Sequence, residues 1–281
     1  MMVPRTERKG GVMKRIVLPL LAVVIASTGM AQAQQKPAAT AKPTAPAPAP
    51  APAPKTNNSR LEVPEVTFRF GYAPQNAKIA HVYWLKNVGT DTMHLADVRP
   101  GCGCTKAPLR KKNVAPGDSA DVEVIFSTGH YSSTVQKSAN IISDAPGMAP
   151  ALTFTAWPVT STDSLQPFTV SPALVDLDSL RNMTGQVSDV NVKVRNVSSQ
   201  DLQFTLVSKP DQWVKVDVPT APIAPGKDEM IKLTFEAAIA DTTLNKSFTI
   251  EASDSAKTRF TVPIQKAMRL GSATTTSSTT H

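Results

Sequence analysis

An internal repeat constrains the fold of this chain more than any other feature of its sequence. Asn87-Val88 recurs as Asn196-Val197, and Ala115-Pro116-Gly117 recurs at the same interval as Ala224-Pro225-Gly226. This interval also places apolar residues on apolar residues in four segments, for example Val66 on Val175, Leu85 on Val194, Met93 on Leu202 and Phe126 on Phe235. One register that holds through so many segments predicts two copies of a single domain.

Within each copy the apolar residues alternate, which is typical of strands with one buried face. Residues 120–126 should bury Val122, Val124 and Phe126, and residues 230–235 repeat the pattern. No window shows sustained helical spacing. Copies of roughly 100 residues, each with about six or seven short strands, predict an all-β protein of two tandem immunoglobulin-like β-sandwich domains. We place these domains at residues 60–160 and 165–266, with a polar break between them.

Residues 1–33 are predicted to be a secretory signal peptide. Lys14-Arg15 supplies the positive charge, residues 16–26 form the apolar stretch, and Ala31-Gln32-Ala33 provides a small-residue cleavage site. A membrane-spanning helix needs roughly 20 apolar residues, so we expect no transmembrane segment after cleavage. The expected location is the periplasm, the cell surface or the medium.

Two biased tracts flank the predicted domains. Residues 34–59 are rich in Ala and Pro, which favours an extended, disordered linker. Residues 267–281 are rich in Ser and Thr and are expected to form a disordered tail. Loss of the signal peptide leaves 25 basic and 21 acidic residues, a net charge of +4. A charge this small argues against nucleic acid, and we expect a protein partner in the cell envelope instead.

The only two cysteines lie in the segment Gly101-Cys102-Gly103-Cys104-Thr105. An exported chain meets an oxidising environment, so a local Cys102–Cys104 disulfide is one interpretation, with Gly101, Gly103 and Thr105 as the supporting loop. Such a bond closes a very short loop and should stabilise the fold only slightly. A second interpretation is thiol–disulfide exchange, in which Lys106 and Arg110-Lys111-Lys112 lower the pKa of a thiol.

The third interpretation is a copper site, because two thiolates could hold Cu(I). Cys102 and Cys104 are the only metal-ligand candidates that the sequence offers. Met93 lies in the alternating apolar positions of its strand and should be buried in the core. His94, the next residue, should point to the opposite face and so to solvent. His81 lies on a neighbouring strand. We therefore expect no cofactor, with copper as the alternative.

One part of the chain is similar to a known family. The Asn-x-Gly turn, the Cys-Gly-Cys-Thr loop, the Pro-Gly turn and the closing strand occur in this order within residues 66–126. This order resembles the bacterial domain of unknown function 1573. The resemblance implies an exported immunoglobulin-like module and no firmly assigned activity. In the second copy Asp211 and Trp213 stand at the cysteine positions, so the resemblance covers only the first copy.

Motifs for catalysis are lacking in this sequence. No nucleophile elbow, His-Glu-x-x-His motif or phosphate-binding loop occurs. A hydrolase would need a pocket that contains a His–carboxylate pair. The three tryptophans, Trp84, Trp157 and Trp213, could form a sugar-binding platform, but packing in the core is the favoured interpretation. We therefore expect a non-enzymatic binding or structural module, with a thiol-active or copper-handling protein as the alternative.

Overall fold

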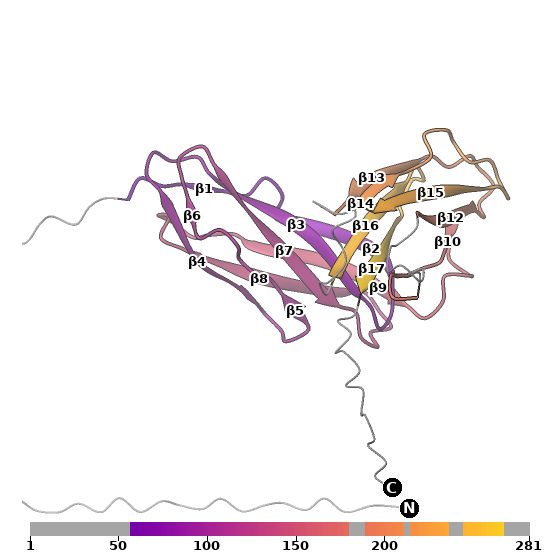
Figure 1. Ribbon diagram of the computed structural model, residues 1–281, viewed down its shortest axis with the longest axis horizontal. Helices are drawn as coiled ribbons and strands as arrows, with labels where there is room; N and C mark the ends of the chain where they lie inside the picture. The colour runs from indigo at the N-terminus through magenta and orange to yellow at the C-terminus, as the bar shows by residue number, and fades with distance from the viewer. Residues whose placement is uncertain (1–56, 180–188, 211–213, 236–243, 267–281) are drawn as a thin grey trace, which may run out of the picture. The chain divides into compact units, whose positions relative to one another are not determined.

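The computed structural model describes residues 57–179, 189–210, 214–235 and 244–266 (Figure 1). All of them belong to one compact unit, Pro54–His281. Every regular element in the described ranges is a β-strand, which confirms the all-β fold class. No helix in these ranges could cross a membrane. The predicted signal peptide, nearly all of the predicted linker and the predicted tail lie outside the described residues.

The strands fall into two groups that follow each other along the chain. The first group, here called the first sandwich, consists of β1 (Leu61–Glu62), β2 (Thr67–Pro74), β3 (Lys78–Asn87), β4 (Met93–Pro100), β5 (Thr105–Lys106), β6 (Asn113–Val114), β7 (Ser119–Ser127), β8 (Val135–Ser143) and β9 (Ala151–Val159). The second sandwich consists of β10 (Phe168–Ser171), β11 (Val175–Asp176), β12 (Val190–Asn196), β13 (Phe204–Ser208), β14 (Val214–Asp217), β15 (Asp228–Phe235), β16 (Leu244–Ala252) and β17 (Arg259–Lys266).

Each sandwich has its own hydrophobic core. In the first, the sheet β1-β3-β7-β5 lies against strands β2, β9, β8, β4 and β6, and Tyr83, Phe126 and Phe154 are fully buried in the resulting cluster. In the second, the sheet β10-β12-β15-β14 lies against β13, β16 and β17, and a separate cluster contains Phe168 and Phe248. Alternation of apolar residues along the strands accounts for both clusters, since every second side chain points to the same face.

Residues that are equivalent in the sequence repeat also make equivalent contacts in the two sandwiches. Met93 pairs with Val114 across β4 and β6, and their counterparts Leu202 and Ile223 form a bridge in the second sandwich. Gly117 and Gly226 follow the two prolines with φ angles of +78° and +74°. Where a turn requires a positive φ, glycine is favoured because it has no Cβ to clash with the backbone. Glycine therefore occurs there in both sandwiches for the same physical reason.

Two apolar positions of the repeat differ from expectation. Val66 is 39% exposed, although its counterpart Val175 is buried. Val66 directly precedes β2 and contributes its carbonyl, which accepts from the Thr153 N–H, rather than its side chain. Phe235, the last residue of β15, is only partly buried against the second core. Both positions lie at the end of a strand or just outside it, where the core no longer covers the side chain.

The two sandwiches share one sheet. Strand β17 pairs with β2 in parallel at Phe260 and Tyr72, so the sheet continues from β13 and β16 through β17 and β2 to β9, β8, β4 and β6 (Figure 1). Ser247 of β16 donates to the Ala80 carbonyl at 2.7 Å and accepts from the Ala80 N–H at 2.9 Å. Hydroxyl and backbone groups that are buried in this way are satisfied by each other.

Burial of charged groups at this junction was not visible in the sequence pattern. Lys246 of β16 and Glu123 of β7 have nearly inaccessible side chains, 7% and 8% exposed, and Lys246 Nζ lies 2.6 Å from Glu123 Oε1. Glu123 occupies a position that alternation assigns to the solvent face of β7, whereas Lys246 alternates with the core residues Phe248 and Ile250 on β16. Glu123 is buried because β16 of the second sandwich brings Lys246 against it.

Candidate functional site

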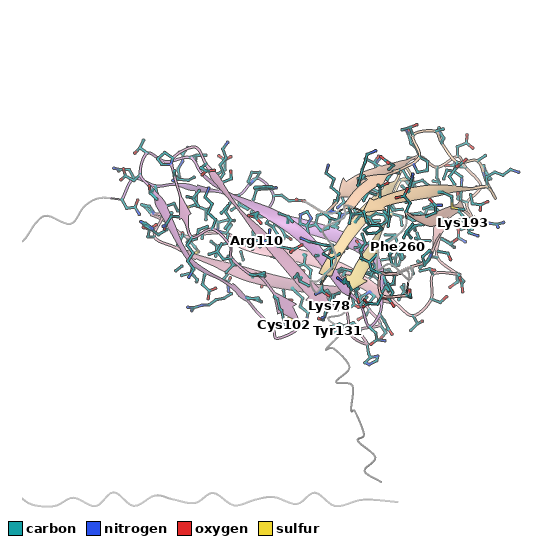
Figure 2. The ribbon with its side chains drawn as sticks, in the orientation of Figure 1. Lys78, Cys102, Arg110, Tyr131, Lys193 and Phe260 are labelled. Atoms are coloured by element: carbon teal, nitrogen blue, oxygen red, sulfur yellow. A yellow bond between two sulfur atoms is a disulfide. The ribbon has the colours of Figure 1, made fainter. Side chains whose placement is uncertain are left out.

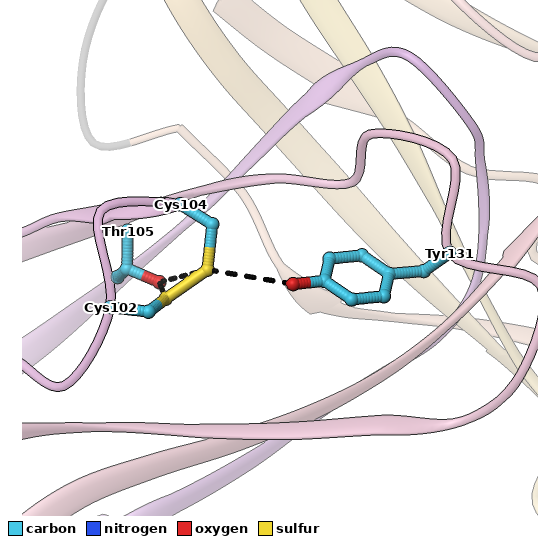
Figure 3. The surroundings of a disulfide bond; sticks show 4 residues. All are labelled: Cys102, Cys104, Thr105 and Tyr131. Atoms are coloured by element: carbon cyan, nitrogen blue, oxygen red, sulfur yellow. Dashed lines mark hydrogen bonds between the residues drawn. A yellow bond between two sulfur atoms is a disulfide. The ribbon is translucent and has the colours of Figure 1, made fainter.

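Cys102 and Cys104 are joined by a disulfide, with their Cα atoms 5.3 Å apart (Figure 3). The bond lies in the connection between β4 and β5, where the chain leaves one sheet of the first sandwich and enters the other. The Gly101 N–H donates to the Ser138 carbonyl on β8, and the Ser127 N–H on β7 donates to the Cys104 carbonyl. Backbone hydrogen bonds therefore anchor the disulfide loop to both sheets.

The supporting residues predicted around the cysteines have different roles. Thr105 is buried, and its Oγ1 lies 3.4 Å from Cys102 Sγ and 3.9 Å from Cys104 Sγ. A Cβ at Gly101 would make only ordinary contacts with Ser138, at 3.6 Å, and one at Gly103 would meet nothing within 4 Å. Neither glycine has a positive φ. Thr105 thus contacts the sulfurs, whereas neither lack of space nor a positive φ explains the two glycines.

Two side chains that sequence reasoning missed lie beside the disulfide. Tyr131 directs its hydroxyl at Cys104 Sγ over 4.0 Å, at the long limit for a bond to sulfur (Figure 3). Lys137 places its Nζ 4.9 Å from the centre of the Tyr131 ring, a cation–π contact. We call Cys102, Cys104, Tyr131 and Lys137 the disulfide patch. Nothing in the local sequence could reveal it, because Tyr131 lies far from Cys104 along the chain, beyond β7.

The basic segment Arg110-Lys111-Lys112 interacts with carboxylates on and beside β7. Arg110 lies 3.4 Å from Asp121 and 3.5 Å from Glu123, and Lys111 pairs with Asp118. The hydrogen bond from Lys111 lowers the pKa of the Asp118 carboxyl. Figure 2 shows Arg110 well separated from Cys102. Arg110 and Lys111, two of the cations that were expected to lower a thiol pKa, are therefore engaged with acidic side chains elsewhere.

The other metal-ligand candidates do not gather at the disulfide. Met93 is fully buried in the first core, and the Nδ1 atom of His94 lies 2.7 Å from Asn113 Oδ1. Within the described ranges no group of three or more His, Cys, Asp and Glu side chains comes together as a metal site. Copper binding remains a proposal that rests on the two sulfurs alone and requires their reduced form. Asp211 and Trp213, at the equivalent positions of the second sandwich, lie outside the described residues.

A His–carboxylate pair, the arrangement that a hydrolase would need, occurs at the junction of the sandwiches. His81 Nε2 lies 3.0 Å from Glu65 Oε2, and His81 Nδ1 lies 2.9 Å from Ser208 Oγ. These three residues, together with Trp84 and Lys209, line a cavity of about 570 Å³. The sequence placed His81 on a strand but gave no signal for either partner, since Ser208 belongs to the other sandwich.

The surroundings of His81 favour a structural role for this pair. Its ring is 7% exposed and stacks face to face on Phe68, with the ring centres 3.6 Å apart and the planes 6° from parallel. Tyr83 meets the same imidazole edge-on, and burial, aided by the charge of Glu65, raises the pKa of the Tyr83 hydroxyl. An imidazole packed on a core phenylalanine and bonded through both nitrogens is fixed in place. We therefore interpret His81 as a polar link between β3 and β13.

The expectation that the tryptophans pack in the core is wrong for the two that the structure describes. Trp84 is 54% exposed and Trp157 is 45% exposed. Trp84 lies between the buried residues Tyr83 and Leu85 on β3, so its side chain leaves the opposite face of the sheet. Trp157 follows the buried Ala156 on β9 in the same way. Trp213 lies outside the described residues.

One comparison with known families matches most of the first sandwich. A family model described as a protein of unknown function (DUF1573) matches residues 61–157. No curated protein matches this chain. Among solved structures, a protein of unknown function from Porphyromonas gingivalis W83 is 11% identical, with 74% of this chain and 99% of that chain covered and a TM-score of 0.31.

Two chaperone structures are similar to the same low degree. The E. coli chaperone DraB is 7% identical, with 73% of this chain and 97% of that chain covered and a TM-score of 0.29. A chaperone–tip adhesion subunit complex, CsuC-CsuE from Acinetobacter baumannii, is 9% identical, with 74% and 100% covered and a TM-score of 0.29. Scores of this size carry no inference about function or partner.

Proposed function

We propose that this chain, whose residues 61–157 form a domain of the family DUF1573, is an exported, non-enzymatic binding protein of the cell envelope. The observation that carries the proposal is the disulfide patch on its first sandwich. Tyr131 is 36% exposed and stands between a disulfide and a lysine. Exposed tyrosines that are held rigid by their neighbours are typical contact residues of protein interfaces.

Rigidity of the patch supports this role. Backbone bonds from β7 and β8 hold the loop, and the ring of Tyr131 packs on the buried Phe126 with the ring centres 6.0 Å apart. A contact surface that is already ordered loses little conformational entropy when a partner binds. The predicted signal peptide and the Ala-Pro linker fit the proposal, because they would export this surface and extend it from an attachment point.

Pairing of a partner strand with the β4 edge is less favoured than contact through the patch. The Val98 N–H is bonded to the carboxylate of Asp97 at 2.9 Å, and Arg99 Nε binds the same carboxylate at 3.0 Å. Pro100 has no N–H to donate. An edge with so few donors resists the addition of a strand. We therefore propose contact through side chains.

Photo-crosslinking in cells tests the proposal. A benzoylphenylalanine replaces Lys137 in the full-length protein, and a matched variant carries it at Arg195, an exposed position on β12. We expect a defined crosslinked protein from position 137 that is absent from position 195 and is lost when Tyr131→Ala is added. The same products from both positions, or none from position 137, would overturn the proposal.

The thiol-active or copper-handling alternative makes a different prediction in the same assay. A binding module keeps its crosslink when Cys102 and Cys104 are both replaced by Ser, because Thr105, Tyr131 and the backbone anchors remain. Loss of the crosslink, together with a mixed disulfide trapped by alkylation or copper retained by the reduced protein, would favour the alternative.

A further inference from the structure

A second candidate binding site lies away from the disulfide patch, where β2 and β9 meet the turn between β16 and β17. A cavity of about 310 Å³ opens there, and residues of both sandwiches line it. Its aromatic wall is Trp157, whose side chain is almost half exposed, and Tyr72 on the neighbouring strand. Their ring centres are 5.0 Å apart and their planes are tilted by 36°. From this cavity we infer a site for an acidic carbohydrate.

The aromatic wall is held in place by the shared sheet. Tyr72 pairs with Trp157 on one side and with Phe260 on the other, and its ring also packs against the second core. A Cβ at Gly71 would lie 2.2 Å from the carbonyl oxygen of Arg259, so only glycine lets β17 approach β2 this closely. The close approach brings the cations of β17 and its preceding turn to the aromatic wall.

Three positively charged side chains line the same cavity: Arg69, Lys257 and Arg259. The carboxylate of Glu251 forms ion pairs with two of these three cations, at 2.7 Å from Arg259 Nε and 3.9 Å from the Arg69 guanidinium. Arg259 also donates to the Arg69 carbonyl at 3.1 Å. Within the described ranges Lys257 pairs with no carboxylate, so the cavity keeps an excess of positive charge. This excess favours an anionic ligand.

The combination of side chains favours an acidic sugar over other anions. A tryptophan and a tyrosine offer flat apolar surface for the C–H face of a pyranose ring, and Thr134 and Thr155 add hydroxyl groups to the lining. Arg69 and Lys257 supply partners for a carboxylate. The volume is at the small end of the roughly 300–1,000 Å³ typical of ligand sites. It suits one or two sugar residues of a uronate-containing glycan.

Calorimetric titration of the mature protein with trigalacturonate tests this inference, with maltotriose as the neutral probe and triglutamate as the acidic peptide probe. We expect trigalacturonate to bind, to bind more weakly as salt concentration rises, and to exceed both other probes. Trp157→Ala should weaken binding at least tenfold and Lys257→Gln about threefold. Trp84→Ala, the matched exposed tryptophan, should leave binding unchanged.

Several results would overturn the inference. They are the absence of trigalacturonate binding, equal binding of triglutamate or maltotriose, and an equal effect of Trp84→Ala and Trp157→Ala. If Trp157→Ala unfolds the protein, Lys257→Gln decides, because Lys257 lies on an exposed turn. These outcomes are independent of crosslinking at Lys137, so this site and the disulfide patch can fail separately.

Discussion

The side-chain amide nitrogens of Asn87 and Asn196 make equivalent hydrogen bonds in the two sandwiches. Each is fully buried, and each Nδ2 donates to two carbonyls, those of Asp91 and Val114 for Asn87 and those of Gln200 and Ile223 for Asn196. The four N···O distances lie between 2.7 and 2.9 Å. The acceptors recur at the same interval as the asparagines themselves. One buried amide thus links the end of a strand to two further segments in both copies.

Asn87→Ala and Asn196→Ala should each destabilise the protein by about 2–3 kcal/mol. Either change leaves buried carbonyls without donors, and an unsatisfied buried group costs roughly 1–3 kcal/mol. Urea unfolding of the full-length protein measures the loss. An exposed asparagine, Asn113, serves as the control, and Asn113→Ala should cost less than about 0.5 kcal/mol. Equal effects of the buried and exposed substitutions would contradict the structural role of the two amides.

Breaking the Lys246–Glu123 pair should cost up to about 3–5 kcal/mol, because removal of one partner takes away the buried group that lies 2.6 Å from the charge that remains. We expect this loss for Lys246→Met and for Glu123→Met, measured by urea unfolding. The double substitution should recover much of it, since replacement of both charges by apolar side chains removes the penalty. Additive losses in the double-mutant cycle would show that the two residues do not depend on each other.

Removal of the disulfide should affect stability only slightly. Cys102 and Cys104 enclose a very short loop, so the entropic contribution should be below about 2 kcal/mol. Urea unfolding of the Cys102→Ser/Cys104→Ser protein measures it. In the wild-type protein recovered from cells, intact mass after alkylation should show no label before reduction and two labels after it. Labelling without reduction would mean free thiols and would favour the thiol-active or copper-handling alternative.

Ser208 should not act as a nucleophile despite its contact with His81. We expect no covalent adduct with a fluorophosphonate probe, measured by intact mass, because the imidazole of His81 is 7% exposed and its face is covered by Phe68, which restricts access of a substrate to the pair. Ser208→Ala should instead lower stability by about 1–2 kcal/mol through loss of the bond to His81. An adduct that disappears in Ser208→Ala would restore the hydrolase hypothesis.

The class of fold and the positions of most buried residues follow from local patterns in the amino-acid sequence. Alternation placed Val122, Val124 and Phe126 in the core correctly, since side chains on a strand alternate between two faces. The Pro-Gly signals located two turns, because the required positive φ is a local property of the backbone. The Cys-Gly-Cys-Thr loop pointed to the domain of unknown function 1573, and the family model matches that part of the chain.

Which outward-facing residues are covered and which remain free depends on how distant segments pack. Glu123 is buried because Lys246 of the second sandwich meets it on the outer face of β7, whereas Trp84 and Trp157 stay about half exposed on the outer faces of their strands. The disulfide patch joins Cys104 to Tyr131, and the cavity at the Trp157 ring joins Trp157 to Lys257, across long stretches of sequence. Alternation specifies the face of a strand, but what packs on that face depends on contacts between segments that are distant in the chain.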